Sequence, residues 1–268
     1  MEATAAVLIT FVYSVLVIIA LYLQPFICPK VHVSYYRPFS ISVMAIISYL
    51  LIYYFNVDHL FHWFNSPYLS KCTIFSTIIL FLGPILQNIF TFINYDYKYI
   101  YKGSMNLYFK RLQRDMLSFD TFKALIIGPF TEEMIYRSFG CSLWESAHIS
   151  YLKTIFILPF LFGVSHLNKV FLEKTISSIK LKDFVPYLGV LGFTTLFGWW
   201  EAFVWLRTHS YFTCTFIHTF CNYMTFPDFK EALEWQNPVQ KIFLYLGYLI
   251  GLIYFFFSIG LIQTTKVV

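Results

Sequence analysis

Apolar segments of about 15 to 25 residues recur from one end of the chain to the other, and they restrict it to a membrane environment. Hydrophobic residues make up 58% of the sequence and charged residues 12%, about half the ~25% of a soluble domain. The expected fold class is all-α, a polytopic membrane helical bundle of about eight transmembrane helices that forms a single membrane domain over residues 1–268. The predicted helices lie near residues 5–24, 39–55, 72–94, 121–146, 152–167, 185–206, 211–223 and 240–262.

Lysine and arginine fall mainly in every second loop between these segments, which predicts an orientation. With eight spans, the termini and even-numbered loops share one side, and that side carries four basic residues: Lys71, Lys153, Arg207 and Lys266. The odd-numbered loops carry thirteen: Lys30, Arg37, Lys98, Lys102, Lys110, Arg111, Arg114, Lys169, Lys174, Lys180, Lys182, Lys230 and Lys241. Because basic loops stay in the cytosol, both termini are expected on the opposite side. The net charge of +5 does not indicate nucleic-acid binding, because the basic residues are spread over these loops.

Two adjacent glutamates and an arginine interrupt the fourth apolar segment, in the run Thr131 to Arg137. A charged side chain at that depth costs at least ~2.5–3.5 kcal/mol on insertion scales, so such residues are functional by default. On a helix, Glu133 and Arg137 are four residues apart and share a face, so they can form an ion pair. Glu132 is rotated by about 100° and can point elsewhere.

Two further polar clusters stand near the ends of apolar segments. His166 closes the fifth segment, and His218 and Asn222 lie four residues apart near the end of the seventh, where both side chains can reach one point. In the predicted topology these residues and Glu132 all fall in the cytosolic half of the membrane. A cavity open to the cytosol could therefore bring them together.

These residue types suit the hydrolysis of an amide bond. A carboxylate beside a neutral histidine can take a proton from a water molecule, and burial makes a carboxylate more basic. A second histidine with an asparagine offers N–H donors to a developing oxyanion.

Three other interpretations use the same residues. The first is a zinc hydrolase with Glu132, His166 and His218 as ligands, although the sequence contains no H-E-x-x-H motif and Asn222 would have no role. The second is a transporter with a Glu/Arg/His proton relay, although the internal repeats usual in transporters are not evident. The third is a non-catalytic scaffold of the same fold.

The three clusters, taken in order, resemble the motifs of a known family. Residues 132–137 match E-E-x-x-x-R, residues 162–166 match F-x-x-x-H, and residues 218–222 match H-x-x-x-N. This series is similar to that of the type II CAAX prenyl proteases, also called Ras and a-factor converting enzymes, within the CAAX-protease and bacteriocin-processing group. All the motifs fall within residues 131–227.

The resemblance implies a protease of the endoplasmic reticulum membrane. Such a hydrolase removes the last three residues (-aaX) from prenylated CAAX proteins such as small GTPases, with its active site open to the cytosol. By the same resemblance, Glu132 is the general base assisted by His166, and His218 and Asn222 form the oxyanion hole. Glu133 and Arg137 would support Glu132. No metal and no cofactor are expected, and the partners are the prenylated substrate and the lipid bilayer.

Two other predictions concern residues outside the motifs. Glu201, in the sixth segment, is expected near its outer end, with its carboxylate reaching toward that interface. Cys141, Cys214 and Cys221 lie in apolar segments, and they are expected to be small buried residues without disulfides.

The predicted orientation can be tested by labelling. Cysteines introduced at Lys110 and Lys174, in two basic loops, should react with a membrane-impermeant thiol reagent in sealed microsomes whose cytosolic face is outward. If both react only after the membrane is permeabilised, the predicted orientation is wrong.

Overall fold

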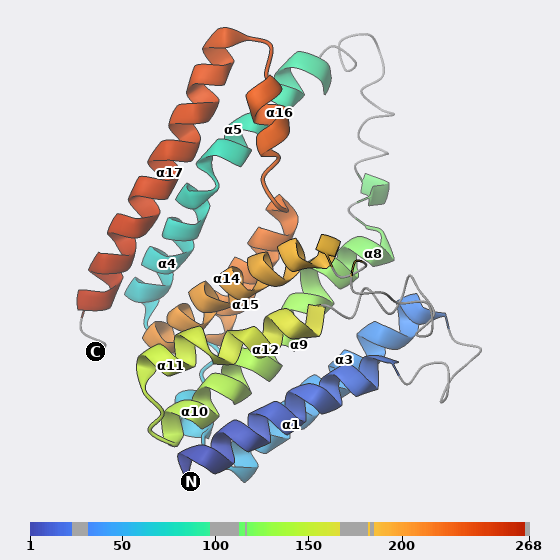
Figure 1. Ribbon diagram of the computed structural model, residues 1–268, viewed down its shortest axis with the longest axis vertical. Helices are drawn as coiled ribbons and strands as arrows, with labels where there is room; N and C mark the ends of the chain where they lie inside the picture. The colour runs from blue at the N-terminus through green and yellow to red at the C-terminus, as the bar shows by residue number, and fades with distance from the viewer. Residues whose placement is uncertain (23–31, 97–112, 116, 167–181, 183–184, 266–268) are drawn as a thin grey trace. The chain divides into compact units, whose positions relative to one another are not determined.

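Helices account for nearly all the regular structure of the chain (Figure 1). The computed structural model describes residues 1–22, 32–96, 113–115, 117–166, 182 and 185–265. Within these residues there is no strand, and the one isolated bridge joins His62 to Ser210. The described chain divides into two units, the first formed by residues 1–65 and 127–215, the second by residues 66–126 and 216–268. The prediction of an all-α fold is therefore confirmed.

The first unit packs two long N-terminal helices against the middle of the chain. Its helices are α1 (Ala3–Tyr22), α3 (Val33–Tyr54), α9 (Gly128–Glu133), the π-helical η5 (Met134–Cys141), α10 (Ser142–Ser146), α11 (Tyr151–Phe156), α12 (Leu158–Ser165) and α14 (Val185–Thr208), with the first residues of α15 (Tyr211–Met224). Helix α3 contacts α1, α9 and η5, and α14 contacts η5, α11 and α12. The central position of η5 places Arg137, and Glu133 at the adjoining end of α9, among several helices.

The second unit pairs the last helix of the chain with a broken helix. Its elements are α4 (Pro67–Leu80), α5 (Leu82–Thr91), the π-helical η2 (Phe92–Asp96), α8 (Phe119–Phe122), the π-helical η4 (Lys123–Ile127), α16 (Phe229–Glu234) and α17 (Pro238–Thr264), with the later residues of α15. Figure 1 shows α17 running beside both α4 and α5, which it contacts along its length. The 52° bend between α4 and α5 falls next to Pro84, which has no N–H for the carbonyl of Leu80.

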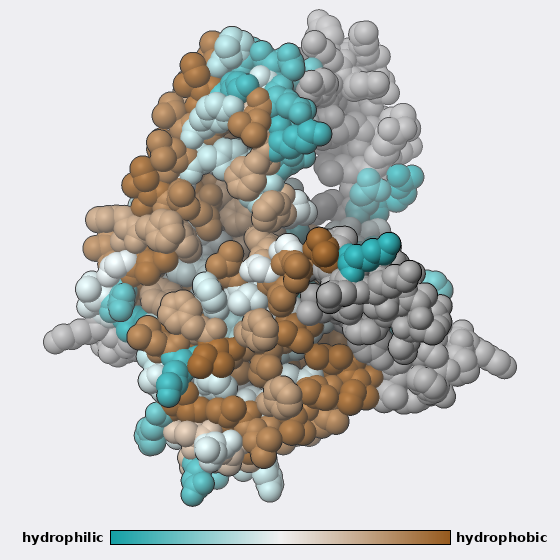
Figure 2. All heavy atoms as spheres, viewed as in Figure 1, coloured by the Kyte–Doolittle hydropathy of each residue, from teal (hydrophilic) through white to brown (hydrophobic). Residues whose placement is uncertain are grey.

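Apolar helices long enough to cross a membrane are present in both units. Among the described residues three helices meet this condition, Ala3–Leu21, Ser34–Tyr54 and Pro238–Thr264, and the bent pair of α4 and α5 would make a fourth. Hydrophobic residues line the visible sides of α17 and α1 (Figure 2). Among the exposed residues of these helices, Phe257 of α17 is 63% exposed and Leu8 of α1 is 62% exposed. These surfaces suit contact with lipid.

The predicted helices agree with the observed ones in position but less well in continuity. Each of the eight predicted segments falls on helix over most of its length, and residues 23, 24 and 167 of these segments lie outside the described residues. The segment 72–94 is broken at Phe81, and the segment 152–167 is broken at Ile157, two residues before Pro159. The count of about eight membrane spans stays a prediction, as does the single domain. Most of the two basic loops chosen for labelling lies outside the described residues.

Glycines allow α17 to approach the break between α4 and α5 closely. A Cβ atom added to Gly251 would lie 2.6 Å from the carbonyl oxygen of Ile79, and one added to Gly247 would lie 2.7 Å from Leu86 Cδ1. A backbone atom cannot move aside as a side chain can, so Gly251 fixes the spacing of these helices. Gly260, further along α17, has no neighbour within 4 Å of such an added atom.

The two glycines of α17 give a matched pair of variants. Gly251→Ala should destabilise the protein by about 1–3 kcal/mol, the usual cost of overpacking, and should lower the midpoint of thermal unfolding in detergent. Gly260→Ala makes the same chemical change in open space, and it should leave the midpoint unchanged or raise it slightly, because alanine favours helix. Equal midpoints for the two variants would contradict the close approach at Gly251.

Candidate active site

A buried ion pair lies at the junction of α9 and η5. Arg137 Nε is 3.3 Å from Glu133 Oε2, and both side chains are fully enclosed, with exposed fractions of 1% and 0%. The ion pair that the four-residue spacing predicted is therefore confirmed. A buried pair of this kind is costly to break, because removing one member leaves the other as an isolated charge.

The guanidinium of Arg137 also rests on the ring of Phe162, the first residue of the F-x-x-x-H motif. The Arg137 Cζ atom lies 4.5 Å from the Phe162 ring centroid, within the range of a cation–π interaction. Gly198 of α14 makes room beside them, since an added Cβ there would lie 2.7 Å from Pro159 Cβ and 3.6 Å from Arg137 Nη2. The first two motifs thus pack together through Phe162 and Arg137.

Glu132 points away from this pair and toward the end of α12, where it meets His166. The distance between Glu132 Oε2 and His166 Nε2 is 4.0 Å, and the two side chains are 21% and 23% exposed. They are therefore partly accessible, unlike Glu133. A separation above 3.5 Å between polar atoms leaves room for a bridging water.

A backbone contact sets the tautomer of His166. Its Nδ1 lies 2.9 Å from the carbonyl oxygen of Phe162, and because a carbonyl can only accept, Nδ1 must carry the hydrogen. In the neutral ring Nε2 is then an acceptor and faces Glu132. A water between the two side chains could donate one hydrogen to each, so this pair is arranged to polarise a water molecule.

His218 and Asn222 lie on the part of α15 that belongs to the second unit. His218 is 4% exposed, and Asn222 Nδ2 donates to the carbonyl of Ala124 at 2.9 Å. One turn earlier, Thr219 donates to the carbonyl of Leu125, also at 2.9 Å. Pro129 has no N–H, so one of the carbonyls four or five positions before it lacks its helical donor.

The structure therefore brings together two sets of the predicted residues. Glu132 lies near His166, and Glu133 pairs with Arg137, both in the first unit. Asn222 is held against η4 in the second unit, and the amide nitrogen keeps a second hydrogen for another acceptor. The meeting of the Glu132–His166 pair with His218 and Asn222 in one cavity stays a prediction.

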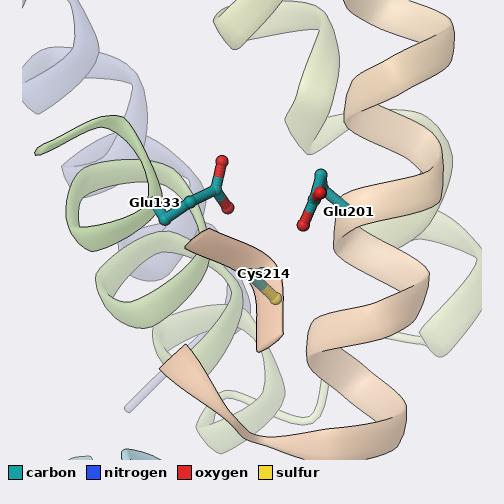
Figure 3. A group of neighbouring side chains, drawn as sticks. All are labelled: Glu133, Glu201 and Cys214. Atoms are coloured by element: carbon teal, nitrogen blue, oxygen red, sulfur yellow. The ribbon is translucent and has the colours of Figure 1, made fainter. Parts of the chain in front are cut away.

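The interpretation of Glu201 was wrong. Its side chain is 0% exposed and does not reach toward an interface. Figure 3 shows its carboxylate facing that of Glu133, with the sulfur of Cys214 close by. The three side chains offer ligand atoms that all lie within 4.8 Å of one another. The only hint of this in the sequence is that Glu201 is a charged residue inside an apolar segment.

The prediction for the cysteines is confirmed. Cys141, Cys214 and Cys221 are buried, and all three are free thiols.

Residues 115–224 match the family model described as type II CAAX prenyl endopeptidase Rce1-like. A Schizosaccharomyces pombe protein named probable CAAX prenyl protease 2 is 27% identical over 68% of this chain and 63% of its own length. The human CAAX prenyl protease 2 is 29% identical over 65% of this chain and 51% of its own length. The Arabidopsis thaliana protein of the same name is 27% identical over 67% of this chain and 59% of its own length.

No solved structure matches the chain. The alignments span between about half and two thirds of the length of these curated relatives. The matched family segment includes all three motifs, from Glu132 to Asn222. The family model and the curated relatives together confirm the resemblance that the motifs indicated: this chain is similar to the type II CAAX prenyl proteases, and residues 115–224 carry the similarity to the family model.

Proposed function

We propose that this protein is a CAAX prenyl endopeptidase that removes the last three residues from prenylated CAAX proteins. The observation that carries the proposal is the Glu132–His166 pair, partly accessible and 4.0 Å apart, next to a sequestered Glu133–Arg137 pair. The names of the curated relatives support the same reaction. Small GTPases with a prenylated C-terminus are the proposed substrates.

In the proposed mechanism, Glu132 acts as the general base. A water held between Glu132 and His166 Nε2 loses a proton to Glu132 as its oxygen attacks the carbonyl of the scissile amide. The amide bond follows the prenylated cysteine, so the products are a prenylcysteine carboxylate and a free tripeptide. The proton taken by Glu132 then passes to the amine that leaves.

His218 and Asn222 are proposed to stabilise the negative charge that develops on the carbonyl oxygen. The hydrogen bond from Asn222 to Ala124 uses one amide hydrogen and orients the other. Donors that are held in place before the reaction stabilise an oxyanion without reorganisation during the reaction. The active site is proposed to open to the cytosol from the endoplasmic reticulum membrane, which agrees with the basic loops and with prenylated proteins as substrates.

The two adjacent glutamates should respond differently to the same substitution. Glu132→Gln removes the base but keeps the shape of the side chain, so turnover of a prenylated peptide should be lost while the thermal midpoint stays at the wild-type value. Glu133→Gln leaves Arg137 without its buried partner, and it should cost about 3–5 kcal/mol in stability together with activity. Peptide cleavage and thermal unfolding, both in detergent, measure the two effects.

Metal analysis of the same variants separates this mechanism from a zinc hydrolase. Wild-type protein and Glu132→Gln should contain equal amounts of metal, because Glu132 acts on water directly. A metal that is present in the wild type and lost in Glu132→Gln would replace the general-base mechanism with a zinc mechanism. An active Glu132→Gln variant would exclude both.

Removal of the Asn222 amide tests the proposed oxyanion hole. Asn222→Ala should lower kcat by about 10²–10³-fold, the range for one lost donor, with little change in KM. Thr219→Val is the matched control, because it removes the neighbouring hydrogen bond to Leu125 on the same helix and should lower stability slightly while keeping kcat. A normal kcat with a raised KM in Asn222→Ala would instead assign Asn222 to substrate binding.

A further inference from the structure

Three helices of the first unit bring two carboxylates and a thiol to one enclosed point. Glu133 comes from α9, Glu201 from α14 and Cys214 from the first turn of α15. All three side chains are fully buried, and one ligand atom from each lies within 4.8 Å of the other two. Figure 3 shows the two carboxylates facing each other, with the Cys214 sulfur near the gap between them.

Glu201 gives the strongest sign that this point holds a further group. Both of its carboxylate oxygens are buried without a hydrogen bond of normal geometry among the described residues, and the polar side chain they interact with is that of Cys214. A buried polar atom without a partner is costly and commonly marks a water or an ion. If Glu201 is ionised, its buried charge needs a cation.

Arg137 interacts with Glu201 as well as with Glu133, but its single charge can balance only one of the two carboxylates. Its Nε is already 3.3 Å from Glu133, and its guanidinium is stacked on Phe162 at 4.5 Å. One arginine balances one carboxylate, so an ionised Glu201 would leave a net negative charge inside the protein. Such a charge is strongly disfavoured in an apolar interior.

We infer that Glu133, Glu201 and Cys214 bind a divalent cation of the zinc class. Thiolate and carboxylate are both ordinary zinc ligands, with bonds of about 2.3 Å to sulfur and about 2.0–2.2 Å to oxygen. Two ligand atoms on one tetrahedral zinc ion are then roughly 3.4–3.6 Å apart, so small rotations of the three side chains would close the site. Calcium and magnesium are poor candidates, because both prefer a shell made of oxygen ligands.

The charges of the site are balanced when the cation is bound. Two carboxylates and one thiolate contribute three negative charges, while a divalent cation and Arg137 contribute three positive charges. The cation takes the place of the protons that a buried carboxyl and a buried thiol would otherwise carry, so binding releases protons and weakens as the pH falls.

The cation would have a structural role that is separate from the proposed hydrolysis. It would tie α9, α14 and α15 together and hold Glu133, so Glu132, the preceding residue, would keep its direction toward His166. Neither Glu132 nor His166 is a ligand in this arrangement, and the site can be tested by metal binding alone. Its failure would therefore leave the proposed protease function untouched.

The test is metal content of the full chain purified in detergent. After dialysis against zinc and then against metal-free buffer, elemental analysis should find one zinc ion per wild-type chain. Cys214→Ala and Glu201→Gln should contain none. Cys141→Ala is the matched control, because it removes another buried free thiol of the same unit, and it should retain the metal. The thermal midpoint of the wild type should fall when zinc is stripped, and that of Cys214→Ala should not change.

A second measurement reports on the sulfur ligand directly. Wild-type protein loaded with Co²⁺ should show thiolate-to-metal charge-transfer absorption, and Cys214→Ser, which preserves the size of the side chain, should lose it. The proposal is overturned if the wild type binds neither metal, or if the Cys214 and Glu201 variants bind as much as the wild type. If the wild type contains no metal and Glu201→Gln unfolds at the same temperature as the wild type, Glu201 carries a proton and the cation proposal is wrong.

Discussion

The buried pair of Glu133 and Arg137 is the interaction on which the rest of the first unit depends. It fixes the face that α9 and η5 turn inward, and its arginine lies on Phe162, the residue whose carbonyl holds the His166 ring. The orientation of the proposed catalytic histidine is thus linked to a salt bridge it does not touch. The E-E-x-x-x-R and F-x-x-x-H motifs are separate in the sequence, but their side chains form one packed network in the structure.

Contacts near a proline link α15 to η4. Pro129 has no N–H and leaves one of the preceding carbonyls without its helical donor, and the π-helical η4 ends two residues earlier, at Ile127. Asn222 and Thr219 of α15 donate to the carbonyls of Ala124 and Leu125 in η4. π-Helical turns occur frequently at functional sites.

The helices and the pairs within one helix could be predicted from the sequence. The contacts made where several helices meet could not. Segment lengths located all eight helical regions, and the four-residue spacing identified the Glu133–Arg137 pair. The bend near Phe81 could have been read from Pro84, but the π-helical turns of η4 and η5 leave no such mark. Glu201 was assigned to the wrong environment because α14 is apolar on nearly every side, so its sequence does not reveal which face meets η5.

The contrast between the two adjacent glutamates shows how one helix can separate structural from chemical roles. Successive residues differ by about 100° around a helix, so Glu133 turns inward to Arg137 while Glu132 turns toward His166 and remains 21% exposed. A base that exchanges protons with water needs that access, whereas a residue that fixes the backbone needs none. The cation site inferred at Glu133, Glu201 and Cys214 would extend the same division, with every metal ligand fully buried and the reacting water beside the partly exposed Glu132.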